Sequence, residues 1–118
     1  GIVPILAPLT HDGHGNLLNT NADTIAAETA KAVAQYSEVT LIYCFEKKGV
    51  LKDENDDNSV FAHLTESDFE RYVKNKVIQG GMIPKLENAF AAIHSGVKRV
   101  IITSSSTFKE GGGTVLEK

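Results

Sequence analysis

The sequence predicts an α/β fold, in which helices cross over between the strands of a mostly parallel sheet. Two observations carry this prediction. Short apolar runs of strand length recur along the 118 residues, and helical segments of about ten to fifteen residues lie between them. Because a helix of that length is the usual connection between parallel strands, the alternation favours a parallel sheet over an antiparallel one.

The N-terminal part is expected to form a buried strand and then a hairpin. Residues 2–9 are uniformly apolar and too short for an amphipathic helix, although Pro4 and Pro8 limit how much of this segment can lie inside a sheet. Turn-forming residues at 11–16 indicate the tip of a hairpin, which returns through residues 17–18. Because the chain opens directly on an apolar run, we also expect it to be a piece of a longer protein.

The first helix is expected over residues 22–36. Asn21 is a favourable N-cap, and Asp23 in the first turn lies at the positive end of the helix dipole. Residues 39–45, rich in β-branched and aromatic side chains, predict a second buried strand after this helix. The apolar face of the helix is expected to contain Ile25, Ala26, Thr29, Ala32 and Val33.

Two more helices are expected in the second half of the chain. Thr65 and Asp68 resemble a capping box, which would open a helix that ends near Ile78. Pro84 is expected to be the first residue of a third helix, which would end near Ser95, just before a glycine.

Two strands and two loops complete the expected order of elements. The strands are predicted at residues 99–103 and 114–116, and the glycines at 111–113 indicate a flexible loop between them. The acidic residues at 53–58 indicate a solvated surface turn rather than a metal site, because nothing in this stretch fixes the geometry of ligands.

Composition and charge narrow the classes of function. The chain has 42% hydrophobic and 23% charged residues, which is ordinary for one soluble globular domain. Its net charge of −3 gives no electrostatic reason to expect nucleic acid or an anionic membrane as a partner. Cys44 is the only cysteine, so no disulfide can form within the chain, and no apolar run approaches the ~20 residues of a membrane span. We therefore expect a cytoplasmic protein.

Lys85 is the most informative candidate for chemistry. It lies in the first turn of the predicted third helix, where a cation meets the positive end of the helix dipole. An anion at this helix end would remove that penalty, because free N–H groups and the ammonium would both point at it. The alternative is a solvent-facing lysine, which costs little. Helix capping alone explains Asn21 and Asp23, but it does not require Asn19.

The turn at residues 45–51 is a second candidate site. It follows a predicted parallel strand, and such sheets bind nucleotides beyond the carboxyl ends of their strands. The turn nevertheless contains neither of the glycine motifs that cradle the phosphates of nucleotides. The four histidines are scattered and only one cysteine is present, so a structural zinc site is not expected.

Taken in order, these segments resemble the C-terminal, nucleotide-binding half of the N-acetylglutamate kinases in the amino acid kinase family. The resemblance covers nearly the whole chain, and its first landmark is the most specific. It implies a three-layer αβα fold with a mostly parallel sheet, in which residues 1–118 form the ATP-binding C-terminal lobe. The four landmarks are Asn19-Thr20-Asn21-Ala22-Asp23, Lys48-Gly49-Val50-Leu51, Gly81-Met82-Ile83-Pro84-Lys85 and Gly113-Thr114-Val115.

This resemblance implies an enzyme that uses ATP to phosphorylate the side-chain carboxylate of N-acetyl-L-glutamate, an early step of arginine biosynthesis. Mg²⁺ is expected with the ATP, held mainly by phosphate oxygens and water, so no protein ligand is assigned to it. The implied partners are ATP, an N-acyl-L-glutamate and, when the protein is full length, further copies of the chain in a homo-oligomer. Without the N-terminal lobe, the fragment is expected to bind nucleotide weakly and to be inactive.

Matching positions imply roles for individual residues. Lys85 would stabilise charge on the transferring phosphoryl group, Asp23 would hold Lys85 and a second lysine in place, and Asn19 would contact the acylated amino acid. These roles suit phosphoryl transfer, which relies mainly on positioning and on cations that face the developing charge. The adenine and ribose site would be lined by Glu46, Lys47, Lys48, Gly49, Val50, Leu51, Val77, Ile78 and Gln79.

The chain also departs from the family in two places, and three alternatives stay open. Phe45 and Glu46 stand where relatives usually have a small or hydroxyl residue followed by aspartate, and residues 104–112 lack the usual histidine-containing loop. The alternatives are an N-succinylglutamate kinase, a non-catalytic module of the same fold that senses a nucleotide or metabolite, and an α/β interaction domain.

Overall fold

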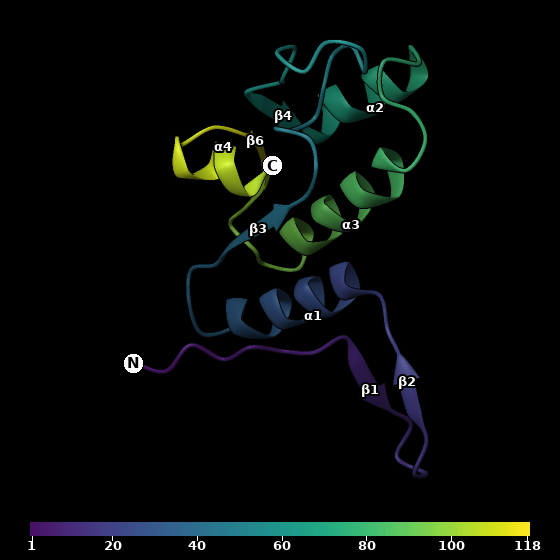
Figure 1. The fold of residues 1–118 in the computed structure, drawn as a ribbon, viewed down its shortest axis with the longest axis vertical. Coiled ribbons are helices and arrows are strands. Elements are labelled where there is room, and N and C mark those ends of the chain that lie inside the picture. Colours follow the sequence, from purple (N-terminus) through teal and green to yellow (C-terminus); the bar gives the residue numbers. More distant parts are fainter.

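The structure, a computed structural model, describes all of residues 1–118, which form six strands and four helices (Figure 1). In chain order they are β1 (Leu9–His11), β2 (Leu17–Asn19), α1 (Ala22–Ala34), β3 (Thr40–Cys44), β4 (His63–Thr65), α2 (Glu66–Lys74), α3 (Met82–His94), β5 (Arg99–Thr103), α4 (Ser105–Lys109) and β6 (Thr114–Glu117).

The main sheet has four strands in the order β3-β5-β6-β4. The pairs β3–β5 and β4–β6 are parallel, and only the central pair, β5–β6, is antiparallel. The sheet is therefore mixed and mostly parallel, which confirms the predicted α/β class. The strands β1 and β2 form a separate antiparallel hairpin, with its tip in the turn that the sequence predicted.

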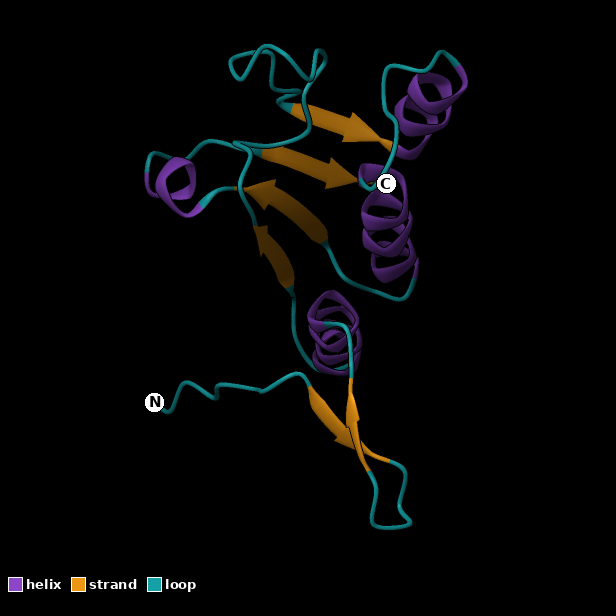
Figure 2. Ribbon diagram, turned by 45° about the vertical axis from the view of Figure 1, so that its right-hand side comes forward, coloured by secondary structure: helices purple, strands orange, loops and turns teal.

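Helices cover both faces of the main sheet, but unequally. Figure 2 shows α2 and α3 on one side of the sheet and the short α4 on the other. The layers are thus αβα, as predicted, with a thin third layer. The core lies between α3 and the sheet, where apolar side chains are completely removed from solvent; these include Leu64, Leu86, Val100, Ile102 and Leu116.

Two of the helices begin where the sequence places their caps. The side chain of Asn21 accepts hydrogen bonds from the N–H groups of Asp23 and Thr24, at 2.8 and 3.4 Å. Thr65 and Asp68 form the reciprocal capping box, with both bonds at 3.2 Å. Each cap satisfies N–H groups that have no partner within the helix, and this is why the local sequence sets these starts.

The ends of α2 and α3 differ by a few residues from the predictions. α2 ends at Lys74, because Lys76 adopts a left-handed φ of 59° and the N–H groups of Val77 and Ile78 both donate back to the carbonyl of Tyr72. α3 begins at Met82, so Pro84 is its third residue. Proline is tolerated there because N–H groups of the first turn have no carbonyl partner within the helix.

The predicted strand over residues 2–9 is wrong for most of its length. Residues 1–7 have no regular structure, and Ile2 and Ile5 are each 94% exposed. A strand is stable only when a neighbour satisfies its backbone groups, and no strand of the main sheet lies beside this segment. Pro4 and Pro8 also lack the N–H groups that such a pairing needs.

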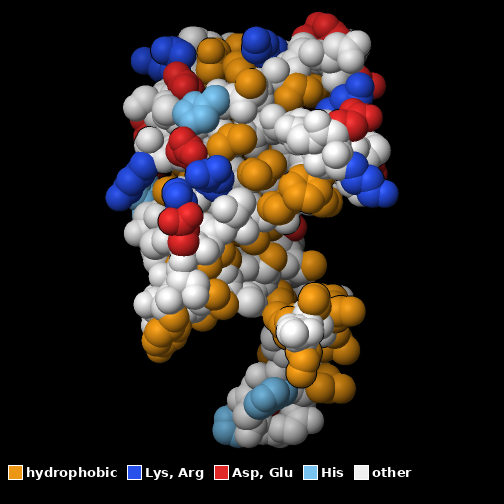
Figure 3. All heavy atoms as spheres, turned by 90° about the vertical axis from the view of Figure 1, so that its left-hand side faces the viewer, with side chains coloured by type: hydrophobic (Ala, Val, Ile, Leu, Met, Phe, Trp, Pro, Cys, Tyr) orange, Lys and Arg blue, Asp and Glu red, His pale blue; other side chains and the backbone are white.

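The buried face of α1 also differs from the prediction. The buried side chains are those of Ala27 and Ala30, through which α1 packs close to α3 and the sheet, whereas Thr29, Ala32 and Val33 are exposed. Part of the predicted apolar face lines a shallow apolar hollow beside the N-terminal segment. Hydrophobic side chains gather near the hairpin at the bottom of Figure 3.

The strand predicted over residues 39–45 exists as β3, but it lies at the edge of the sheet and is not fully buried. Leu41 and Tyr43 point into the core, while the residues between and beside them are exposed. Two short elements, β4 and α4, were not predicted, because three and five residues carry too little periodicity. None of the four helices has the length and the apolar character that crossing a lipid bilayer requires.

Candidate functional site

An ion pair joins the first turns of two helices that are distant in the sequence. The ammonium Nζ of Lys85 lies 2.7 Å from Oδ2 of Asp23, although the two residues are 62 positions apart. Their side chains are 21% and 38% exposed, so the pair is partly shielded from water yet can be reached from solvent. The two residues for which the family resemblance implies catalytic roles are therefore in direct contact.

The start of α3 provides an electropositive surface around Lys85. Its N-cap is Gly81, which has no side chain to accept a hydrogen bond, and no acidic residue lies in the first turn. The positive end of the helix dipole therefore adds to the charge of the ammonium. Asp23 offsets part of this charge, and an anion approaching from solvent would meet the remainder.

Two aromatic rings border the same ammonium. Nζ of Lys85 lies 5.4 Å from the ring centre of Tyr43 and 5.6 Å from that of Phe45. The hydroxyl of Tyr43 donates a hydrogen bond of 3.2 Å to the backbone carbonyl of Asp23. Burial, and secondly the negative charge of Asp23, raise the pKa of Tyr43 to about 12. The hydroxyl consequently remains a neutral donor at physiological pH.

A cavity of about 330 Å³ brings together two segments that were predicted to bind nucleotide. The first is the turn after β3, and the second is the segment between α2 and α3. Glu54, Asn55 and Met82, which the sequence did not single out, also line it. The predicted residues that line this cavity are Lys47, Gly49, Val50, Leu51, Val77, Ile78 and Gln79.

The hydroxyl of Thr114 holds the turn after β3 in place, a contact that sequence reasoning missed. It accepts a hydrogen bond of 2.9 Å from the N–H of Val50 and donates one of 2.6 Å to the carbonyl of Phe61. A Cβ at Gly49 would lie only 2.7 Å from this hydroxyl, so the turn needs glycine there. The only available signal was the Gly-Thr-Val landmark, which by itself implies no role for the threonine.

Three other predicted site residues lie elsewhere. Glu46 and Lys48 are exposed and do not line the cavity. The ammonium of Lys48 instead donates to the side-chain oxygen of Asn58 at 3.5 Å. Asn19 is the exposed last residue of β2, two positions before the cap of α1.

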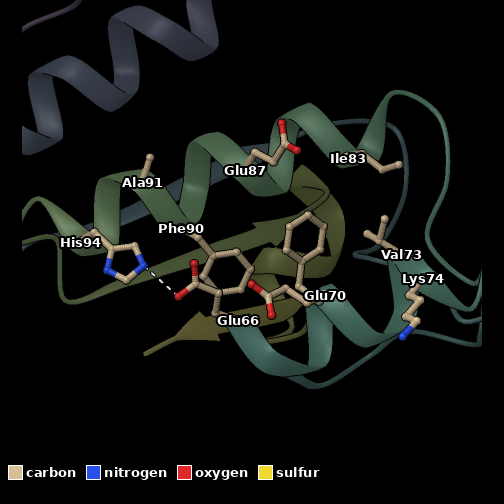
Figure 4. Close-up of a pocket in the computed structure, with 10 residues that line it drawn as sticks. Glu66, Glu70, Val73, Lys74, Ile83, Glu87, Phe90, Ala91 and His94 are labelled. Carbon is tan, nitrogen blue, oxygen red and sulfur yellow. Dashed lines mark hydrogen bonds and ion pairs between the residues drawn. The ribbon is translucent and has the colours of Figure 1, made fainter.

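A second and wider groove lies between α2 and α3, on a different face of α3 from Lys85. Its floor contains the stacked rings of Phe69 and Phe90, 5.5 Å apart, and His94 contacts Glu66 across it at 2.8 Å (Figure 4). None of its lining residues was predicted as part of a site. No group of three or more His, Cys, Asp or Glu side chains in the chain is arranged to hold a metal ion.

Comparison with known proteins agrees with this architecture. The model of the amino acid kinase family matches residues 1–104. The chain is 64% identical over its whole length to an acetylglutamate kinase of Bacteroides thetaiotaomicron, and 50% identical over 110 residues to one of Cytophaga hutchinsonii. It spans less than half the length of these relatives, 46% and 42%.

Solved structures share the fold. The crystal structure of smu.665 from Streptococcus mutans superposes with a TM-score of 0.74 and 34% identity, over 97% of this chain and 42% of the other. An N-acetylglutamate synthase from Neisseria gonorrhoeae, solved with coenzyme A and N-acetyl-glutamate, gives a TM-score of 0.77 at 22% identity, over 94% of this chain and 26% of its own. The second likeness concerns the fold alone. From the match along residues 1–104, the chain belongs to the amino acid kinase family.

Proposed function

We propose that this chain is the ATP-binding, C-terminal lobe of an enzyme that phosphorylates the side-chain carboxylate of N-acetyl-L-glutamate, a step of arginine biosynthesis. The observation that carries the proposal is the 2.7 Å contact between Lys85 and Asp23 at two adjoining helix starts. It is supported by relatives named acetylglutamate kinase, which match the whole chain.

The nucleotide would lie in the cavity beside the turn after β3. The cavity volume of about 330 Å³ is within the range of about 300–1,000 Å³ that is typical of small-molecule sites. Val50, Ile78 and Met82 offer apolar surface for a base, and the side chain of Lys47 offers a charge for phosphate or ribose oxygens. Met82 also opens α3, so the cavity leads toward the helix start that carries Lys85.

Phosphoryl transfer needs cations placed where negative charge develops on the transferring group. Lys85 would supply such a cation, and Asp23 would hold the ammonium in position through their ion pair. Asn19 would contact the acylated amino acid, the role that its place in the first family landmark implies. Mg²⁺ bound with ATP would neutralise phosphate charge, held mainly by phosphate oxygens and water.

The rest of the active site would lie outside this chain. The curated relatives are more than twice as long as this chain. We propose that the part of the protein beyond this chain contains a second lysine, the phosphate loops, most of the acylglutamate pocket and the contacts of a homo-oligomer. Glu46 and Lys48 would approach the nucleotide only if the turn moved on binding.

Substitution of Lys85 in the full-length enzyme tests the proposal. Lys85→Ala is expected to lower kcat by about 100- to 1,000-fold, as loss of one transition-state donor does, while KM for ATP changes little. Lys98→Ala is a matched control, because Lys98 is exposed and pairs with Glu38 far from the cavity. An unchanged kcat in Lys85→Ala would remove the catalytic assignment.

Kinetics with two substrates separate the acetyl and succinyl alternatives. The names of the relatives favour N-acetyl-L-glutamate, so kcat/KM should be higher for it than for N-succinyl-L-glutamate. A full-length protein that binds ATP and phosphorylates neither compound would instead be a nucleotide-sensing module of the same fold.

A further inference from the structure

We propose that Tyr43 and Phe45 are positioning residues, whose two rings hold the ammonium of Lys85 at the place where it acts. We call this pair of rings the aromatic cradle. The inference rests on the proposed function and deepens it, because it gives a role to Phe45, one of the two residues at which the chain departs from its relatives.

Tyr43 is held rigidly and touches both members of the ion pair. Its side chain points from β3 into the core, and the residue is only 6% exposed. Its hydroxyl donates to the backbone carbonyl of Asp23, which ties the first turn of α1 to the sheet. Its ring meanwhile lies 5.4 Å from the ammonium of Lys85. One side chain thus fixes the carboxylate-bearing turn and borders the cation.

Phe45 supplies the second ring. It follows the last residue of β3, and its backbone N–H still donates to the carbonyl of Thr103 at 2.9 Å, so the backbone keeps the direction of the strand. Its ring centre lies 5.6 Å from Nζ of Lys85. Both distances are within the ~6 Å at which a ring face attracts an ammonium.

Rings can restrain the ammonium without cancelling its charge. A second carboxylate in their place would hold Lys85 as firmly, but its negative charge would oppose that of an incoming phosphate. The faces of Tyr43 and Phe45 attract the cation through their quadrupoles while carrying no net charge. Of the three groups around the ammonium, only Asp23 carries a negative charge. The charge that Asp23 does not offset can therefore act on a phosphoryl group.

The test uses the full-length enzyme with variants that remove one component each. Phe45→Leu removes one ring and is expected to fold, since Phe45 is only partly buried. Tyr43→Leu removes the other ring together with the hydroxyl, and Tyr43→Phe removes the hydroxyl alone. Phe45→Tyr is the conservative variant that should keep activity. Tyr36→Leu is the control, because Tyr36 is 86% exposed and lies outside the site.

Two readouts are measured for each variant. The first is kcat together with KM for ATP. The second is the NMR shift of the ε-methylene protons of Lys85, assigned by their disappearance in Lys85→Ala. Rings stacked against a methylene move its resonance upfield, so this signal reports the cradle directly, whether or not the enzyme turns over.

Loss of one ring is expected to move the ε-methylene signal downfield and to lower kcat by about three- to tenfold with KM for ATP little changed. An unmoved signal in Phe45→Leu and Tyr43→Leu would overturn the cradle itself. A moved signal with unchanged kcat, in an enzyme that Lys85→Ala inactivates, would overturn its role in positioning. An enzyme that Lys85→Ala leaves fully active would instead refute the proposed function.

Discussion

At the scale of single residues, the ion pair explains why a lysine can stand at the start of a helix. A cation there loses about 0.3–1 kcal/mol to the helix dipole when it has no partner. Asp23 offsets this cost from the start of a second helix, where its own negative charge is favourable. Since the pair is partly exposed, it adds little to stability, and its value lies in placing a charge.

Tyr43 should make the free energy of unfolding depend on pH in the alkaline range. Its pKa in the folded chain is raised from 10.0 to about 12, chiefly by burial. Below the pKa of the unfolded chain, 10.0, Tyr43 is protonated in both the folded and the unfolded state, so it adds no pH dependence to stability. As the pH rises from 10.0 toward 12, the unfolded chain loses this proton first, and the free energy of unfolding therefore falls.

We therefore expect the urea midpoint of the chain to fall across this alkaline range, and Tyr43→Phe to fall less steeply. The other two tyrosines, Tyr36 and Tyr72, are more exposed and serve as controls when replaced by phenylalanine. Equal slopes for the chain and for Tyr43→Phe would contradict the shift.

At the scale of elements, short-range chemistry decides where helices start, and close backbone packing decides how strands connect. Asn21 and the Thr65–Asp68 capping box satisfy N–H groups within four residues of themselves, so their effect can be predicted from the local sequence. The hydrogen bond that the backbone N–H of Thr65 donates to the carboxylate of Asp68 is the largest cause that holds the pKa of Asp68 below its ordinary value. The connection into β6 depends instead on contacts with β5, the strand before it.

Gly113 lies in the connection into β6 and contacts β5, so its substitution tests how much these contacts contribute to stability. It adopts a φ of 126°, and a Cβ there would lie 2.8 Å from Cβ of Thr103 and 2.9 Å from the carbonyl of Ile102. Gly113→Ala should therefore lower the free energy of unfolding by about 2–3 kcal/mol, through strain and overpacking together.

Gly111→Ala is the matched control for this substitution. Gly111 also has a positive φ, 79°, but a Cβ there would meet nothing within 4 Å. It should cost only the backbone strain of about 1–2 kcal/mol. Chemical denaturation of both variants measures the difference, and equal losses would show that contact with β5 does not matter.

At the scale of the whole molecule, the topology assembles the candidate site from distant parts. β3 lies at the edge of the sheet, and its carboxyl end adjoins the starts of α1 and α3 through Tyr43 and Phe45. This is the place where parallel sheets generally bind ligands. Ten residues of this chain line the cavity beside it, whereas most of the acylglutamate site is proposed to lie in the remaining length of the relatives.

We therefore expect the 118-residue chain alone to bind ATP weakly and to show no turnover. Its melting temperature should rise only slightly with ATP and Mg²⁺, because stabilisation follows the ratio of ligand concentration to Kd. The full-length enzyme should show a larger rise and should phosphorylate N-acetyl-L-glutamate. Phosphorylation by the short chain would contradict the assignment of the missing groups to another lobe.

The fold class and most of the elements can be predicted from residue patterns alone, whereas the contact between Lys85 and Asp23 is implied only by the family resemblance. Caps, strand-length apolar runs and helix-length segments express local hydrogen bonding and periodicity, which require only neighbouring residues. Seven of the nine residues predicted for the nucleotide site line one cavity, because they belong to two short segments that meet there. Glu46 and Lys48 do not, because both side chains are exposed and the ammonium of Lys48 donates to Asn58 instead.

Local sequence patterns therefore establish the α/β order of elements, the starts of α1 and α2, and the charged groups available for chemistry. Long-range packing establishes that residues 1–7 lie exposed, that α1 buries Ala27 and Ala30, and that β6 runs antiparallel to β5 between it and β4. The physical reason is that pairing of strands and packing of faces depend on partners far away in the chain. The aromatic cradle around Lys85 arises in the same way, from the end of one strand meeting the starts of two helices.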